Sequence, residues 1–254
     1  MPTMQDEAVV IRRWDWSETS QTVSLLTREH GILRGIAKGA KREKGSFSGG
    51  LDLLTRGQIV AIVKPGRDLA TLAQWSLEET FRHLRQSLAA NRAGLYFADL
   101  IHHVLSQHEA NAPAYDTFVR GLRDLADRSM IGLTMLRFQW SMLVHAGYQP
   151  ILDRDAETGQ QIPEDVPTVA FSAEAGGVVT DNGATGRWRV RRETIALLVA
   201  IAADEAPVDM PDATIDRANR LCAAYWREVL GREIASMRFA FSDGLQGPAR
   251  PQTR

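Results

Sequence analysis

GILRGIAKGAKREKGSFSGGLDLLTRGQIVAIVKPGR (residues 31–67) decides the fold, because a strand pattern there runs into glycine-spaced cations and then returns to a strand pattern. The stretch holds eight Lys and Arg residues against two carboxylates, a local net charge of plus six in a chain whose formal net charge is −1. A charge-balanced chain that concentrates its cations in one connection forms a local electrostatic site, and phosphates are the commonest anions to bind one. The connection therefore indicates contact with a polyanion.

Five short strand patterns occupy the first eighty residues: 8–14, 21–27, 32–38, 58–64 and 69–77. Turn residues separate them, so they predict hairpins rather than helical crossovers. In the third pattern Leu33, Gly35 and Ala37 share one face, and small residues suit a tightly curved interior. Arg34 and Lys38 then point outward. Five such strands predict a small closed β-barrel of the oligonucleotide-binding (OB) type, whose exposed strands and loops bind nucleic-acid chains.

The connection between the third and fourth strand patterns, residues 39–56, is long for a small barrel, and long ordered loops usually have a function. Its glycines leave the backbone accessible. Phe47 within it has two possible roles, because its ring can anchor the loop in the core or stack on a base.

From residue 81 onward the hydrophobic period changes from two to about three and a half, which predicts a helical domain. The expected helices lie near 81–88, at 95–105, from Pro113, at 133–144, at 194–203 and at 212–230. An irregular insert, residues 148–190, interrupts them, and residues 242–254 are expected to be disordered. Arg187, Arg189, Arg191 and Arg192 close the insert and are interpreted as a solvated helix entrance. We therefore expect a multi-domain α+β protein with domains at 1–80 and 81–241.

Composition limits the remaining possibilities. A chain of 254 residues can bury a full core in one large or two small domains. Cys222 is the sole cysteine, which excludes an internal disulfide framework and a multi-cysteine zinc cluster. Neither a signal-peptide pattern nor an apolar run of about twenty residues is present. We expect a cytoplasmic, nucleoid-associated protein without a cofactor.

An enzymatic interpretation depends on Asp99 and His102, since a carboxylate three residues before an imidazole can share a metal on one helix face. Helix-borne histidines are more often packing or surface residues. No phosphate-binding P-loop, dinucleotide glycine motif or nucleophile elbow is found in the sequence. We therefore expect no enzymatic activity and no metal site.

Several short motifs, in order along the chain, resemble the RecO family of bacterial DNA repair and recombination mediator proteins. They are WSETS (16–20), LLTREHG (25–31), AKGAKR (37–42), GYQP (147–150), LGR (230–232) and SMRF (236–239). The resemblance implies an N-terminal OB barrel, a helical domain, and binding and annealing of single- and double-stranded DNA. It also implies contacts with RecR and with the acidic C-terminal tail of single-stranded-DNA-binding protein, helping to load RecA.

The resemblance places DNA contact at residues 37–42, where the family's basic barrel loop lies. Neighbouring cations are added by proximity and charge. The DNA-binding side chains expected are Arg34, Lys38, Lys41, Arg42, Lys44, Arg56 and Lys64.

This sequence departs from the family in its insert, where many members carry a four-cysteine zinc module. The matching stretches here are DRDAETG (153–159) and FSAEAGGVVTDNG (171–183), which contain no cysteine. Asp155, Thr158, Thr180 and Gly183 stand where thiolates would. Zinc with sulfur ligands is thereby excluded, and the insert is expected to be a zinc-free relic held by hairpin pairing alone.

Two alternatives remain open beside a DNA repair mediator. One is an RNA-binding or scaffold protein that uses the same barrel. The other is a metal hydrolase centred on Asp99 and His102.

Overall fold

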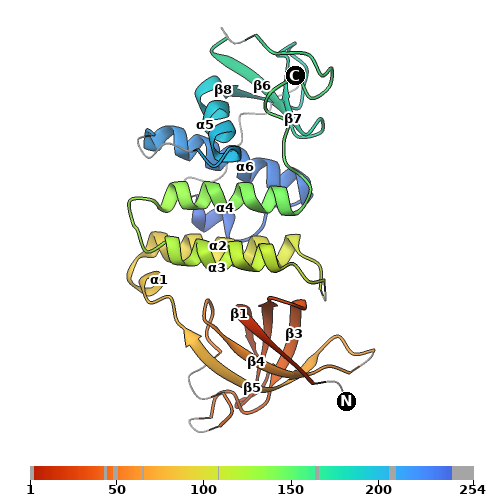
Figure 1. The fold of residues 1–254 in the computed structure, drawn as a ribbon, viewed down its shortest axis with the longest axis vertical. Helices are drawn as coiled ribbons and strands as arrows, with labels where there is room; N and C mark the ends of the chain where they lie inside the picture. The colour runs from red at the N-terminus through yellow and green to blue at the C-terminus, as the bar shows by residue number, and fades with distance from the viewer. Residues whose placement is uncertain are drawn as a thin grey trace. The chain divides into compact units, whose positions relative to one another are not determined.

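The computed structural model describes residues 3–42, 45–47, 51–64, 66–107, 109–163, 166–205 and 210–241. The chain forms two compact units, Met1–Arg128 and Ser129–Arg254 (Figure 1). Lys44 and the tail 242–254, for both of which the sequence made predictions, lie outside the described residues.

A five-stranded sheet opens the first unit. Its strands are β1 (Thr3–Asp15), β2 (Gln21–Thr27), β3 (Gly31–Ala37), β4 (Arg56–Ile62) and β5 (Ala70–Glu79). They are hydrogen-bonded in the order β1-β2-β3-β5-β4, and β4 pairs back onto β1, so that the sheet closes on itself. We call it the closed sheet. All five strands occur where the alternating pattern predicts them, although β1 begins five residues earlier than expected.

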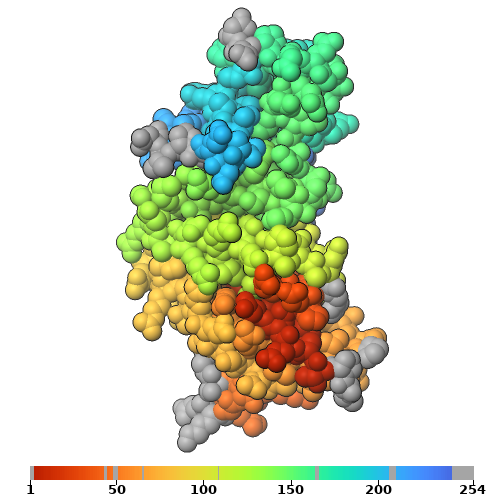
Figure 2. Space-filling view, viewed as in Figure 1, coloured from red at the N-terminus to blue at the C-terminus, as the bar shows by residue number. Residues whose placement is uncertain are grey.

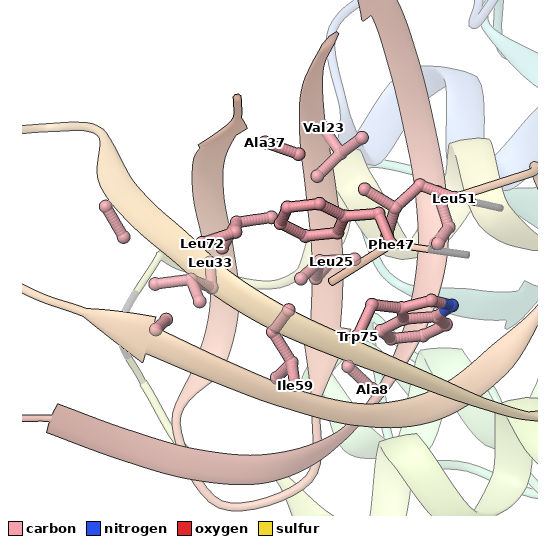
Figure 3. Packing of buried hydrophobic residues seen from close by; sticks show 13 residues of the cluster. Ala8, Val23, Leu25, Leu33, Ala37, Phe47, Leu51, Ile59, Leu72 and Trp75 are labelled. Carbon is pink, nitrogen blue, oxygen red and sulfur yellow. The ribbon is translucent and has the colours of Figure 1, made fainter. Parts of the chain in front are cut away.

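Alternation along the strands fills the inside of the closed sheet with apolar side chains. Leu33 and Ala37 of β3 belong to this core, as predicted. Phe47 is 6% exposed and lies among Val23, Leu25 and neighbouring side chains (Figure 3). Its ring therefore anchors the long connection rather than stacking on a base.

The first half of β3 lacks β5 as a neighbour, because the two strands pair only over residues 35–37 of β3. Gln107, in the connection between two helices, forms a parallel bridge with Ile32 at that position. Gly31 has φ of +69°, and a Cβ there would lie 2.2 Å from the carbonyl oxygen of Glu109. Glycine is needed for both reasons, and this contact ties the helical connection to the sheet edge.

Three helices complete the first unit: α1 (His83–Gln86), α2 (Leu88–Val104) and α3 (Ala112–Asp124). The Ser87 hydroxyl accepts the backbone N–H of Ala90 and caps α2, which separates α1 from α2. The expected helix over 81–88 is therefore a single short turn, and Leu88 is 67% exposed instead of buried. The helix expected from Pro113 is α3. The buried side chains along it and at its end are Tyr115, Phe118, Val119, Leu122 and Leu125, whereas Ala126 is exposed.

The second unit contains α4 (Ile131–His145), α5 (Arg192–Ala202), α6 (Asp212–Val229) and α7 (Met237–Ala240). Buried Gln139 of α4 donates to the side-chain oxygen of Asn219 of α6 at 2.8 Å, and Asn219 donates to the carbonyl of Gly132 at 2.8 Å. Buried amides paired in this way fix the register between the two helices.

The insert contains a three-stranded sheet, β6 (Thr168–Ser172), β7 (Gly177–Val179) and β8 (Arg187–Arg191), in the order β7-β6-β8. The Phe171 ring stacks on Trp188, with centroids 5.8 Å apart, and meets the Tyr225 ring of α6 edge-on. The aromatic contacts join this small sheet to the helices of the second unit.

The buried carboxylate of Asp155 also holds the insert together. Its Oδ1 accepts the backbone N–H groups of Glu157 and Thr158, each at 2.9 Å. Its Oδ2 accepts the backbone N–H of Thr180 at 2.7 Å and the Thr180 hydroxyl at 2.6 Å. The prediction that hairpin pairing alone holds the insert is therefore wrong, because one carboxylate joins two segments 25 residues apart.

The fold confirms a five-stranded N-terminal sheet followed by helices, an α+β architecture.

Candidate nucleic-acid interface

The predicted DNA-binding motif forms a turn directly after β3, residues 38–42, which we call the basic turn. It packs on the turn between β1 and β2. The backbone N–H of Lys41 donates to the carbonyl of Thr19 at 3.2 Å, and the backbone N–H of Gly39 lies 3.4 Å from the Ser20 hydroxyl. These bonds fix the turn at the edge of the closed sheet.

Lys41 serves partly as a structural residue. Its Nζ lies 2.9 Å from a carboxylate oxygen of Asp15 and 3.5 Å from the carbonyl oxygen of Ser17. The hydrogen bond from Lys41 lowers the pKa of Asp15. Part of the Lys41 charge is thus balanced within the protein.

Lys38 and Arg42 are exposed. Their side chains make no hydrogen bond or ion pair with any residue in the described part of the chain. Two cations on an anchored turn are well placed to bind a phosphate, because none of the described carboxylates competes for them.

Arg34 lies on the outer face of β3, half-buried. Its positive charge is one of the causes that lower the pKa of His102, to about 4, although burial is the largest. Lys64 follows the end of β4 and is also half-buried. Lys44 belongs to the part of the chain that is not described.

Arg56 differs from the other cations, because two carboxylates surround it. Its guanidinium nitrogens lie 3.6 Å from Glu7 and 2.7 Å from Glu78, and its side chain is 17% exposed. A phosphate would have to compete with both carboxylates. The structure thus brings Lys38, Lys41 and Arg42 together in one turn and places Arg56 in an internal ion-pair network.

Two exposed tryptophans beside the basic turn were not predicted as site residues. Trp14 is 44% and Trp16 65% exposed, and the Trp16 backbone N–H donates to the Ser20 carbonyl in the β1–β2 turn. Figure 2 shows the N-terminal residues, in red, as part of the molecular surface. The sequence could have indicated them, because it places two large aromatic side chains two residues apart at the end of a predicted strand.

The cluster behind the metal-hydrolase interpretation forms an ion-pair network. Arg12 pairs with Asp99 and lies 3.2 Å from Nε2 of His103, while the adjacent His102 is half-buried and its buried Nδ1 has no hydrogen-bond partner among the described residues. Among the described residues, no group of three or more His, Cys, Asp or Glu side chains could hold a metal ion. The described helices also include none that could span a membrane.

The insert does not fit the zinc of related modules. Both Asp155 oxygens accept hydrogen bonds from N–H and O–H donors, and the hydroxyl of Thr158 accepts the N–H of Gln160 at 3.3 Å. Gly183, at the fourth position, has no side chain to coordinate a metal. This donor set offers no thiolate, and its carboxylate is already satisfied.

The fold and the anchored basic turn define an α+β protein with an electropositive edge on a closed sheet, a class that suits contact with nucleic acid. The family model described as Recombination protein O N terminal matches residues 1–81, and the one described as Recombination protein O C terminal matches residues 85–238. The chain belongs to the RecO family of DNA repair proteins.

Individual relatives agree with this assignment. The protein named DNA repair protein RecO of Rhodopirellula baltica is 31% identical over 209 residues, which cover 82% of this chain and 77% of the relative. Its namesake in Myxococcus xanthus is 29% identical over 248 residues, covering 96% of this chain and 100% of the relative. That of Syntrophotalea carbinolica is 25% identical over 256 residues, covering 98% of each chain.

Proposed function

We propose that this RecO-family protein acts in homologous recombination without catalysing a reaction, by binding single- and double-stranded DNA through the basic turn. The observation that carries the proposal is the state of Lys38 and Arg42, which are exposed and have no carboxylate partner among the described residues, on a turn fixed by hydrogen bonds. Each phosphate that a cation neutralises releases counterions, so such a site binds DNA of any sequence.

The closed sheet is proposed to be an OB-type barrel. The strand order β1-β2-β3-β5-β4, with β4 paired to β1, supports this. The proposed domains are the OB domain, 1–80, and the helical domain, 81–241. The family models divide the chain between residues 81 and 85, whereas the compact units divide it after Arg128, because α1–α3 cluster with the closed sheet.

The proposed DNA contacts differ in strength. Lys38 and Arg42 contribute most, since nothing in the described chain balances them. Lys41 contributes less because of Asp15, and Arg56 least because Glu7 and Glu78 hold it. Arg34, Lys64 and Lys44 are retained as contacts by proximity and charge.

DNA annealing follows from the same chemistry. A protein that neutralises the phosphates of both complementary strands lowers their mutual repulsion and lets them pair. By family resemblance we further propose contacts with RecR and with the acidic tail of single-stranded-DNA-binding protein, which help to load RecA. The insert is proposed to be a zinc-free relative of the family's zinc module, with the Asp155–Thr180 hydrogen bonds joining the two former ligand pairs.

The test is a double variant, Lys38→Ala with Arg42→Ala, which leaves the Lys41–Asp15 pair in place. The logarithm of the binding constant falls linearly with the logarithm of the salt concentration, by about 0.7 for each phosphate contact with a single strand. Removing two contacts should reduce this slope by about 1.4, which corresponds to binding about 25-fold weaker at 0.1 M salt. Affinity is measured by fluorescence anisotropy over a salt series, and fold integrity by circular dichroism.

The matched control removes the same charge elsewhere. Arg189 and Arg191 of β8 have side chains that are 74% and 64% exposed, and alanine at both should leave DNA affinity nearly unchanged. Unchanged affinity of the Lys38 and Arg42 variant would show that DNA binds another surface. Tighter binding of RNA than of DNA of the same sequence would favour the RNA-binding alternative instead.

A further inference from the structure

The outer faces of β1, β2 and β3 carry two rows of side chains beside the basic turn. The strand registers place Arg12, Ser24 and Arg34 in one row and Trp14, Thr22 and Ile36 in the next. The opposite face of these strands carries the core residues Val23, Leu25, Leu33 and Ala37, so all six side chains of the two rows point away from the core.

Trp14 and Trp16 stand out on this surface. The other four tryptophans of the chain, Trp75, Trp140, Trp188 and Trp226, are at most 8% exposed. The hydrogen bond from Trp16 to Ser20 continues the β1–β2 pairing, so Trp14 and Trp16, two positions apart, lie on the same side. Two residues along a strand rise about 6.7 Å, roughly twice the 3.4 Å separation of stacked bases, which leaves room for one base between the two rings.

Not every side chain of these rows is accessible. Thr22 is 8% and Ser24 0% exposed, and their hydroxyl oxygens are buried, so neither hydroxyl is open to a ligand. Arg34 lies in the same row as Ser24, and exposed Lys38 follows at the end of β3. Arg12, by contrast, is held by Asp99.

We propose that the exposed part of these rows and the adjoining turn, the stacking face (Trp14, Trp16, Ile36, Arg34 and Lys38), binds the unpaired bases of single-stranded DNA by stacking. The proposal rests on the proposed DNA-binding function and adds a preference to it. Base faces are available in a single strand and hidden in a duplex, so the tryptophans discriminate between the two while the cations of the basic turn do not. A surface on which cations lie beside exposed aromatic rings complements the phosphates and bases of a nucleic-acid strand better than it complements an apolar surface of a protein partner.

The test compares Trp14→Ala with Trp16→Ala, alone and combined, against the same positions replaced by Phe. Stacking on one aromatic ring contributes about fivefold or more to affinity, so the double alanine variant should bind a single-stranded oligonucleotide at least about 25-fold more weakly. Its affinity for a duplex of the same length should stay within about twofold of the unmodified protein. The double Phe variant, which keeps the aromatic faces, should retain most single-strand affinity.

Leu88→Ala is the control for loss of an exposed apolar side chain, because Leu88 is 67% exposed in the same unit. It should change neither affinity. Intrinsic tryptophan fluorescence gives a second measurement: single-stranded DNA should quench it, and the double Phe variant should lose most of that quenching.

The outcomes separate this inference from the proposed function. The stacking face is overturned if the double alanine variant binds single-stranded DNA as tightly as the unmodified protein does. It is also overturned if that variant loses affinity equally for single strand and duplex, or if the double Phe variant does not retain single-strand binding. The proposed function fails instead if the Lys38 and Arg42 variant binds DNA as the unmodified protein does.

Discussion

Replacing Asp155 by alanine should destabilise the insert more than any other single carboxylate change there. The carboxylate is 2% exposed and accepts four hydrogen bonds, two from the segment at 157–158 and two from Thr180. Alanine removes the acceptor and leaves four donors behind in a partly buried place. The strand β7 would then lose its connection to residues 155–158.

The magnitude follows from these contacts. A hydrogen bond to a charged group contributes about 1.5–3 kcal/mol net, so four independent bonds would give at least about 6 kcal/mol. They converge on one carboxylate, and water can hydrate part of the freed N–H groups, so we expect a loss of about 3–5 kcal/mol. This is a large share of the roughly 5–15 kcal/mol by which domains are stable. Asp155→Asn, which keeps one accepting oxygen, should lose less.

Urea unfolding followed by circular dichroism measures the loss, and hydrogen exchange locates it. The amides of Thr158 and Thr180 should lose protection in Asp155→Ala. Asp153→Ala is the matched control, since that carboxylate is 70% exposed and pairs only loosely with Arg154, at 3.5 Å. A loss below about 1 kcal/mol, with protection of both amides unchanged, would show that the hydrogen bonds of Asp155 do not hold the insert.

Four further predictions follow. Hydrogen bonds from Thr180 and neighbouring amides lower the pKa of Asp155 in the folded protein. The stability that this carboxylate contributes is therefore complete above the ordinary carboxyl pKa near 4 and is lost as the pH falls through the lower pKa of the folded state. In acid-unfolding curves, the difference in unfolding free energy between the unmodified protein and Asp155→Asn should narrow below about pH 4. Burial raises the pKa of Cys222 to about 12, so a thiol reagent at pH 8 should label it only after denaturation. Gly31→Ala should lower the melting temperature sharply, because its Cβ would overlap the carbonyl of Glu109, whereas Gly66→Ala, with open space around it, should cost less. Elemental analysis of tag-free protein should find no stoichiometric zinc, and one zinc per chain would contradict the account of the insert.

Much of the fold could be predicted from local patterns. Alternation located all five strands of the closed sheet, and the helical period located α3, α4, α5 and α6 within two residues at most ends. The inward face of β3 was also predicted correctly from Leu33 and Ala37. Where prediction failed, a local signal was overruled: the Ser87 cap separated α1 from α2 although the apolar spacing continued into Leu88.

The candidate site could be predicted only in part. The cluster of cations at 38–42 is visible in the sequence, because like charges are adjacent in the chain. The exposed pair Trp14 and Trp16 was equally visible but has no meaning until its neighbours are known. Which cations are available to a ligand was not visible at all.

The sequence by itself determined which segments are strands and helices and where positive charge gathers, since both depend on residues close together in the chain. The tertiary structure alone decided which charges are balanced. It places Arg56 between Glu7 and Glu78 and Lys41 beside Asp15, and it lets the Asp155 carboxylate accept a hydrogen bond from Thr180. The physical reason is that strand register brings together residues that are tens of positions apart, and no periodic pattern in the sequence records those pairings.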